Sequence, residues 1–146
     1  DVDGVLTNGE FIYDKKGKVA KIFGAHDSDG LNIIKDRYNI IFISSDKRGF
    51  NISNKRVKDM GFKLYYIKNQ QRLKFVEKYD FQKVIFMGDG IHDAPILKKV
   101  KYGIAPRNAV EEAKKNANLV TKRSGGNGAV YEASMKLLKK NIKWKV

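Results

Sequence analysis

Two pairs of aspartates are the residues of this chain whose types and spacing best fit a chemical role. Asp1 and Asp3 stand in the segment DVDGVLT, and Asp89 and Asp93 stand in GDGIHD. Four carboxylates gathered in one place need a divalent cation to neutralise them. Such a cluster can supply a nucleophile and a proton donor for phosphoryl transfer. Asp-Gly pairs also form plain turns, but two acidic loops associated with matched apolar strands favour a functional site.

The elements that would position these aspartates alternate between strands and helices. Two apolar runs, NIIFIS at 39–44 and KVIFM at 83–87, are typical of strands buried on both faces. The other strands are expected at 63–67, 102–105 and 118–121, and the helices at 27–38, 51–60, 70–79, 94–100, 109–116 and 129–141. This order predicts an α/β fold of Rossmann-like type, with three α/β/α layers and a central parallel sheet. In such sheets functional groups gather beyond the carboxyl ends of the strands.

A β-hairpin is predicted near the start of the chain, at about residues 10–23. Short apolar and polar alternations flank the sequence DKKG, which supplies a glycine-containing turn. The whole chain, 1–146, has the length of a single domain with one core. Asp1 stands where a strand should end, so we expect the first strand of the sheet to lie upstream of residue 1.

The net charge of +14, from 30 Lys+Arg against 16 Asp+Glu, raises the alternative of a nucleic-acid partner. The basic residues are spread over every predicted helix and turn, which favours a lysine-rich solvated surface instead. We therefore expect no nucleic-acid partner, although nucleic-acid end processing with salt-sensitive binding stays open as a hypothesis. No apolar stretch approaches the length of a membrane span, and cysteine is absent, so we expect a cytoplasmic protein without a membrane partner. We expect the basic C-terminal segment around Trp144 to be a solvated helix end or a subunit contact.

These motifs resemble those of a known family. DVDGVLT matches motif I, DxDGxxT, of the haloacid dehalogenase superfamily of phosphotransferases, and GDGIHD resembles its motif IV. Ser44 stands where motif II has a Ser or Thr. With the segments TNG, HDSDG and GGNGAV and the hairpin, the whole chain resembles the capless branch typified by 3-deoxy-D-manno-octulosonate 8-phosphate (KDO 8-phosphate) phosphatase. The resemblance implies a capless fold with a protruding hairpin.

The resemblance also implies roles for individual residues. Asp1 resembles the nucleophile that forms an aspartyl-phosphate, and Asp3 the general acid/base. The Mg²⁺ ligands would be Asp1, the carbonyl of Asp3 and Asp89, with Asp93 near the ion directly or through water. The implied contacts to substrate or phosphate are Thr7, Gly9, Ser44, Ser45, Arg72 and Lys74.

Two departures from the family pattern concern the substrate side of the site. Arg72, in the segment KNQQRLK, takes the expected position of the motif III lysine. Its planar guanidinium places donors differently from an ammonium group, and Lys74 or Lys68 could substitute. The family's Thr-Gly-Arg after the second strand is replaced by Ser44, Ser45 and Asp46.

The resemblance implies an enzyme, a Mg²⁺-dependent phosphatase that hydrolyses a small phosphorylated sugar acid. Such a reaction belongs to sugar-acid biosynthesis, for example the synthesis of the sugar acids of lipopolysaccharide. KDO 8-phosphate and a related nonulosonate 9-phosphate are the leading substrates. Members of this branch are tetramers whose core is built by the hairpin, so we expect a homotetramer. The alternative is a non-catalytic oligomerisation domain associated with an acylneuraminate cytidylyltransferase.

Overall fold

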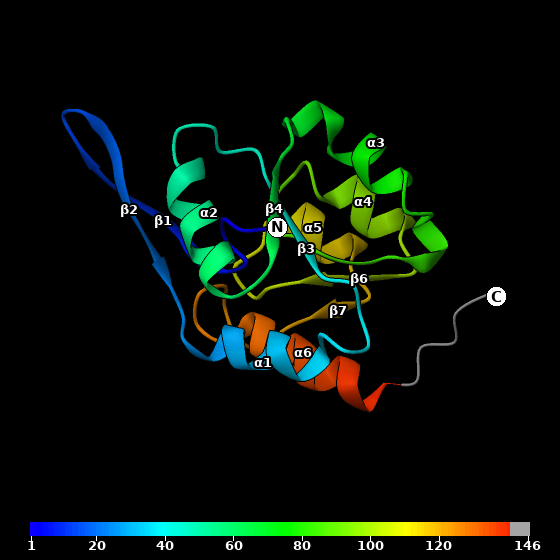
Figure 1. Cartoon of the computed structure of the whole chain (residues 1–146). Helices are drawn as coiled ribbons and strands as arrows, with labels where there is room; N and C mark the ends of the chain where they lie inside the picture. Colours follow the sequence, from blue (N-terminus) through cyan, green and yellow to red (C-terminus); the bar gives the residue numbers. More distant parts are fainter. Residues whose placement is uncertain (141–146) are drawn as a thin grey trace.

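The computed structural model describes residues 1–140 and contains the predicted alternation of strands and helices (Figure 1). The described strands are β1 (Thr7–Asp14), β2 (Gly17–Phe23), β3 (Ile41–Ser44), β4 (Lys63–Tyr66), β5 (Ile85–Met87), β6 (Tyr102–Ala105) and β7 (Leu119–Val120). The α-helices are α1 (His26–Ile34), α2 (Phe50–Asp59), α3 (Arg72–Glu77), α4 (Ala94–Lys99), α5 (Glu111–Asn116) and α6 (Ala129–Lys139). The predicted helix end at Asn141 and the segment around Trp144 lie outside the described residues.

Three predicted boundaries differ from the structure. The first helix ends at Ile34 and continues as a turn, in which the N–H groups of Arg37 and Tyr38 donate to the Ile34 carbonyl. The helix predicted at 70–79 is a short 3₁₀ turn, Asn69–Gln71, followed by α3. A second 3₁₀ turn at Phe81–Lys83 delays the start of β5. Local turn hydrogen bonds of this kind leave no mark on apolar periodicity.

The strands that follow the hairpin pair in parallel, as predicted. β3 pairs with β4, and β6 lies between β5 and β7. Side chains alternate between the two faces of these strands. Ile43 contributes to a core cluster with α3, α4 and α5, whereas its neighbour Phe42 contributes to a cluster with α1, α2 and α6. Two helical layers therefore enclose the parallel strands.

A slot separates β3 from β5. Within residues 1–140, no strand pairs with the edges of β3 and β5 that line it. The cavity between them has a volume of about 350 Å³ and is lined mainly by apolar side chains. The backbone nitrogen of Asp1 donates to the Met87 carbonyl at 3.1 Å, so Asp1 lies beside the carboxyl end of β5.

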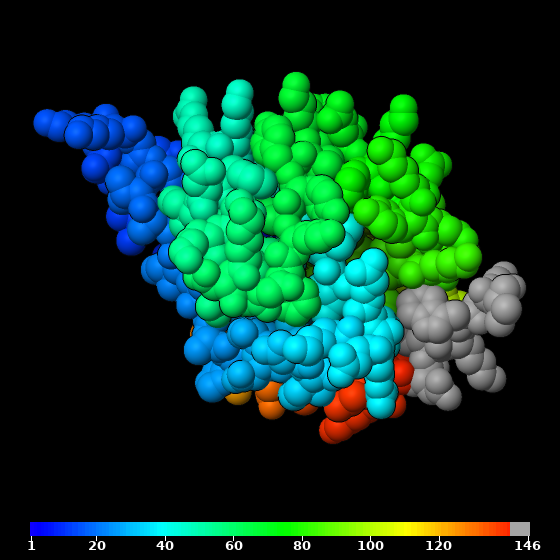
Figure 2. Space-filling model, in the orientation of Figure 1, coloured from blue at the N-terminus to red at the C-terminus, as the bar shows by residue number. Residues whose placement is uncertain are grey.

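The hairpin of β1 and β2 projects from the body of the molecule (Figures 1 and 2). The two strands pair antiparallel, with Asp14 opposite Gly17 at the turn. Its exposed apolar side chains are Phe11, Ile12, Tyr13, Val19 and Ile22. In the described part of the chain, no helix has the length and apolarity needed to cross a membrane.

Candidate active site

The loop that follows Asp1 is a tight turn with its own hydrogen bonds. The Val2 carbonyl accepts from three backbone N–H groups, the last that of Thr7. The Thr7 hydroxyl oxygen accepts from the N–H groups of Gly4 at 3.0 Å and Gly9 at 3.1 Å. Thr7 is fully buried, so its side chain shapes this loop.

Gly4 brings the two acidic loops into contact. Its φ of +78° lies in the left-handed region, and a Cβ at this position would collide with the carboxylate of Asp89. A residue with a side chain would therefore push the motif I loop away from the motif IV loop. The glycine of DxDG is needed here for both backbone conformation and space.

Three carboxylates meet beside this glycine. One oxygen from each of Asp1, Asp89 and Asp93 lies within 4.8 Å of the others. Oδ2 of Asp93 accepts from the N–H groups of Asp89 and Gly90, both at 3.0 Å. Its Oδ1 is buried and accepts no hydrogen bond. Asp93 thus has one oxygen anchored by backbone N–H groups and one oxygen that faces the other charged groups of the site.

The crowding of these carboxylates changes their acidity. Burial, together with the negative charge of Asp93, raises the pKa of Asp89 to about 6. A cation placed between the carboxylates would remove this penalty.

Arg72 supplies part of the missing positive charge. Its side chain is buried, and Nη2 forms ion pairs with Asp1 Oδ1 at 3.0 Å and with Asp93 Oδ1 at 2.7 Å. Nη1 donates to the Ser45 hydroxyl at 3.3 Å. Arg72, at the position predicted for the motif III lysine, is therefore the basic residue paired with these two aspartates, whereas Lys74 is exposed on α3.

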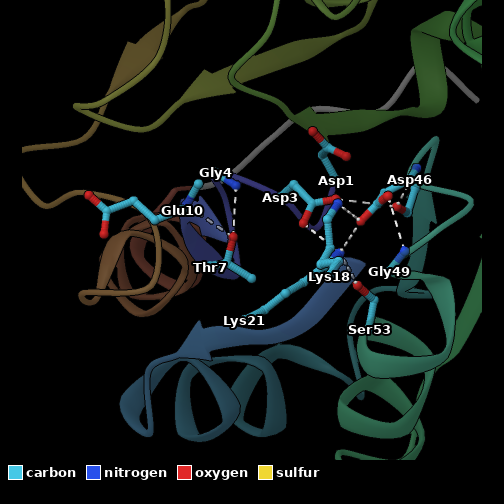
Figure 3. Close-up of polar contacts among 12 residues, drawn as sticks. Asp1, Asp3, Gly4, Thr7, Glu10, Lys18, Lys21, Asp46, Gly49 and Ser53 are labelled. Atoms are coloured by element: carbon cyan, nitrogen blue, oxygen red, sulfur yellow. Dashed lines mark hydrogen bonds and ion pairs between the residues drawn. The ribbon is translucent and has the colours of Figure 1, made fainter. Parts of the chain in front are cut away.

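The Asp3 carboxylate faces Lys21 of the hairpin (Figure 3). Oδ1 forms an ion pair with Lys21 Nζ at 2.7 Å. Oδ2 accepts a long hydrogen bond of 3.4 Å from the Ser44 hydroxyl. The Asp3 carboxyl is therefore held from both β2 and the end of β3.

The basic residues of the hairpin were not among the predicted site residues. Lys18 and Lys21 both form ion pairs with Asp46 Oδ2, at 2.6 and 2.8 Å. Burial alone would raise the pKa of Asp46, but the two ammonium groups outweigh it and lower that pKa to about 2. No local signal could have singled out two lysines among 30 basic residues.

Asn108 was also missed. Its side-chain nitrogen donates to the Gly4 carbonyl at 2.9 Å, and its side-chain oxygen accepts from the Gly125 N–H at 2.6 Å. It therefore ties the motif I loop to the glycine-rich segment GGNG. The only available signal was its place just after a buried strand, where polar residues gather in this fold class.

Two of the predicted substrate contacts are hydrogen-bonded to residues of the site. The Ser44 hydroxyl donates to Asp3, and the Ser45 hydroxyl accepts from Arg72. Gly9 is exposed and donates to Thr7. The predicted contacts of all six residues with substrate or phosphate stay predictions: Thr7, Gly9, Ser44, Ser45, Arg72 and Lys74.

The donor set fits a hard divalent cation. The residues joined by these ion pairs and by the carboxylate cluster comprise five aspartates and three basic groups, which leaves two negative charges without a counter-charge. Carboxylate oxygens are the ligands that Mg²⁺ prefers, and Oδ1 of Asp93, which accepts no hydrogen bond from the described residues, lies among them. Asp1, Asp89 and Asp93 are the side chains that would hold the ion.

A family model for haloacid dehalogenase-like hydrolases matches residues 5–133. The chain belongs to this family. The predicted family and the predicted α/β fold class are thereby confirmed.

Curated relatives extend the similarity over nearly the whole chain. The 3-deoxy-D-manno-octulosonate 8-phosphate phosphatase of Haemophilus influenzae is 29% identical, covering 94% of this chain and 79% of that protein. The enzyme of the same name from Escherichia coli K12 is 28% identical, covering 94% of this chain and 76% of that protein.

Solved structures of such phosphatases have the same fold. The Moraxella catarrhalis phosphatase, in complex with magnesium, phosphate and KDO, has a TM-score of 0.83 at 25% identity, covering 94% of this chain and 82% of that one. The cobalt-bound Haemophilus influenzae phosphatase has a TM-score of 0.80 at 25% identity, covering 94% of this chain and 84% of that one.

Proposed function

We propose that this protein is a Mg²⁺-dependent phosphatase that hydrolyses a small phosphorylated sugar acid through an aspartyl-phosphate on Asp1. It is a hydrolase of phosphoric monoesters, as its family and its curated relatives indicate. The observation that carries the proposal is the meeting of Asp1, Asp89 and Asp93 with Arg72 at the carboxyl end of β5.

In this proposal Asp1 attacks phosphorus. Arg72 pairs with its Oδ1 and so orients the carboxylate, while the other oxygen forms the bond to phosphorus and the ester bond to the sugar breaks. A bound Mg²⁺ supplies the charge neutralisation that lets an anionic carboxylate approach an anionic phosphate.

Asp3 moves the proton. In the first step it protonates the departing sugar oxygen, and in the second step it accepts a proton from the water that attacks the aspartyl-phosphate. The products are inorganic phosphate, the free alcohol and the original Asp1 carboxylate. The placement of Asp3 beside Lys21 of the hairpin supports separate roles, with Asp1 as the nucleophile and Asp3 as the acid and base.

The substrate is proposed from the relatives. KDO 8-phosphate is the substrate named for the curated relatives, and a nonulosonate 9-phosphate is the second candidate. Asp46 occupies the loop after β3, and its carboxylate is engaged by Lys18 and Lys21. Both lysines are buried and paired with carboxylates, so we assign them to shaping this side of the site and not to contacting the substrate.

The assembly is proposed from the hairpin. Its exposed apolar residues form the kind of surface that marks a protein contact, and we infer a homotetramer built around it.

Phosphate release from a panel of sugar phosphates, with Mg²⁺ and with EDTA, tests the proposed function. We expect Mg²⁺-dependent release that Asp1→Asn abolishes, because an amide is a poor nucleophile. Asp59→Asn is the matched control, since Asp59 is an exposed carboxylate on α2 paired only with Lys55 in the described structure. A folded wild-type protein with no phosphatase activity on any substrate would instead favour a non-catalytic oligomerisation domain.

A further inference from the structure

Lys21 is a buried ammonium group beside the proposed acid. Its side chain is 0% exposed, and Nζ lies 2.7 Å from Asp3 Oδ1 and 2.8 Å from Asp46 Oδ2. Nζ also donates to the Ser53 hydroxyl at 2.7 Å (Figure 3). Three partners match the three N–H bonds of an ammonium group. A lysine buried in this way is fixed in position, unlike one on a solvated surface.

Lys18 provides an internal comparison on the same hairpin. Its side chain is also buried and pairs with Asp46 at 2.6 Å. Its other close neighbour is the ring of Phe11, with Nζ 3.5 Å from the ring centroid. Lys18 therefore supports Asp46, whereas Lys21 contacts both Asp46 and Asp3.

The Asp3 carboxyl has two anchors of unequal strength. The ion pair with Lys21 is 2.7 Å long and joins a buried ammonium group to a carboxylate that is 23% exposed, while the hydrogen bond from Ser44 is 3.4 Å long. Charge-assisted contacts are shorter and about twice as strong as neutral ones. The orientation of the carboxyl therefore depends mainly on Lys21.

We propose that Lys21 is a positioning residue, which holds the Asp3 carboxyl in the orientation that transfers a proton to the leaving group. This inference rests on the proposed function. Misplacing a catalytic group by about 1 Å can cost about 10²-fold in rate. Lys21 acts from β2, so the hairpin contributes to the chemistry of the site as well as to its surroundings.

A purely structural role for Lys21 has a different signature. If Lys21 only neutralised the charges of Asp3 and Asp46, its loss would lower kcat/KM equally for all substrates. Loss of a positioned proton donor lowers kcat/KM much more for esters whose alkoxide is a poor leaving group than for p-nitrophenyl phosphate. The p-nitrophenolate leaves without needing a proton.

The test compares kcat/KM of the full chain and of Lys21→Met on p-nitrophenyl phosphate and on the sugar phosphate that the wild type hydrolyses fastest. We expect a loss of about 10²-fold on the sugar phosphate and of less than about tenfold on p-nitrophenyl phosphate. Lys18→Met, the matched control, should keep the wild-type ratio between the two substrates. Equal losses on both substrates, or no loss on either, overturn the proposal.

Two further measurements keep the test decisive. If Lys21→Met does not fold, Lys21→Met with Asp46→Asn removes one charge of each sign and still leaves Asp3 without its ammonium partner. Crystal structures of the wild type and of the variant give a measurement that needs no turnover. An Asp3 carboxyl displaced in the variant supports the positioning role, and one that keeps its place overturns it. The structures thus separate a failure of this inference from a failure of the proposed function.

Discussion

Nη2 of Arg72 lies 2.7 Å from Oδ1 of Asp93, a buried oxygen that accepts no hydrogen bond from residues 1–140. The same nitrogen reaches Asp1 at 3.0 Å, so one guanidinium joins the proposed nucleophile to a proposed cation ligand. Removing one partner of a buried pair leaves an uncompensated charge, which is costly.

Arg72→Met should therefore lower kcat/KM by about 10²- to 10³-fold, the range for losing one electrostatic stabiliser of a transition state. It should also increase the rise in unfolding temperature on adding Mg²⁺, because the carboxylates then depend more on the ion. Arg72→Lys should recover most of the activity, because it keeps the positive charge. It should not recover all of the activity, because the hydrogen bond to Ser45 is lost. Steady-state kinetics and thermal unfolding measure the two effects.

Arg37→Met serves as the control, because Arg37 is exposed and donates to the Leu138 carbonyl, away from the site. An Arg72→Met variant with wild-type kcat/KM would show that the two ion pairs have no part in turnover.

The raised pKa of Asp89 predicts that cation binding stabilises the fold more as the pH rises. For a carboxyl whose folded pKa, about 6, lies above its unfolded value, the stabilising contribution is fully present below the unfolded pKa and is lost as the pH rises through about 6. The metal-free protein should lose this contribution between about pH 4 and 6, and Mg²⁺ should restore stability most near pH 7.

Denaturant unfolding at pH 5, 6 and 7, with EDTA or with Mg²⁺, measures this effect. Asp89→Asn should flatten the dependence, because an amide does not titrate and binds the ion poorly. A Mg²⁺ stabilisation of the wild type that stays constant from pH 5 to 7 would contradict the prediction.

Gly4 should be more sensitive to substitution than its backbone conformation alone requires. Gly4 and Gly61 have similar φ angles, +78° and +86°, but a Cβ on Gly61 would meet nothing within 4 Å. Gly61→Ala should therefore cost about 1–2 kcal/mol of stability and leave kcat/KM unchanged. Gly4→Ala should cost more stability and also abolish Mg²⁺-dependent activity, because the Asp89 carboxylate must move. Equal effects of the two substitutions on both measurements would rule out the collision as their cause.

The order of strands and helices and the meeting of the two acidic loops could be predicted from the sequence. Apolar runs at the positions of β3 and β5 mark strands buried on both faces, and parallel strands bring their carboxyl ends to one edge. The positions of Asp1, Asp89 and Asp93 follow from that geometry. Arg72 was expected only from the resemblance to the family's motif III, with Lys74 or Lys68 as alternatives.

The lysines of the hairpin could not be predicted, for a physical reason. Lys21 reaches Ser53 and Asp3 only because the hairpin folds back against α2 and the motif I loop, and this is a long-range contact. Apolar periodicity reports which side of a strand faces the core, but not which lysine is buried with acidic partners. The role of Asp46 was hidden in the same way, since both of its basic partners come from the hairpin.

Assembly through the hairpin predicts that charges on its apolar surface will separate the subunits. Ile12 and Ile22 are 50% and 48% exposed, so replacing both with Glu should leave the monomer folded while burying charge at the contact. Light scattering after size exclusion should change from tetramer to monomer. Ile33→Glu, a comparably exposed position on α1 at 47%, should stay tetrameric. A wild-type protein that is monomeric at all concentrations would contradict the proposed assembly.

The slot between β3 and β5 predicts that a further strand will stabilise the fold. An apolar strand added before Asp1 should fill the 350 Å³ cavity in parallel with both edges, because the hydrogen bond from the Asp1 nitrogen to the Met87 carbonyl lies in line with such a ladder. An N-terminal extension of five apolar β-branched residues should bury side chains worth on the order of 2 kcal/mol each before the entropy of ordering them. Denaturant unfolding should therefore show a higher free energy of unfolding and a steeper dependence on denaturant. A Gly-Ser extension of equal length is the control, and an equal gain from it would show that the slot does not take up a strand.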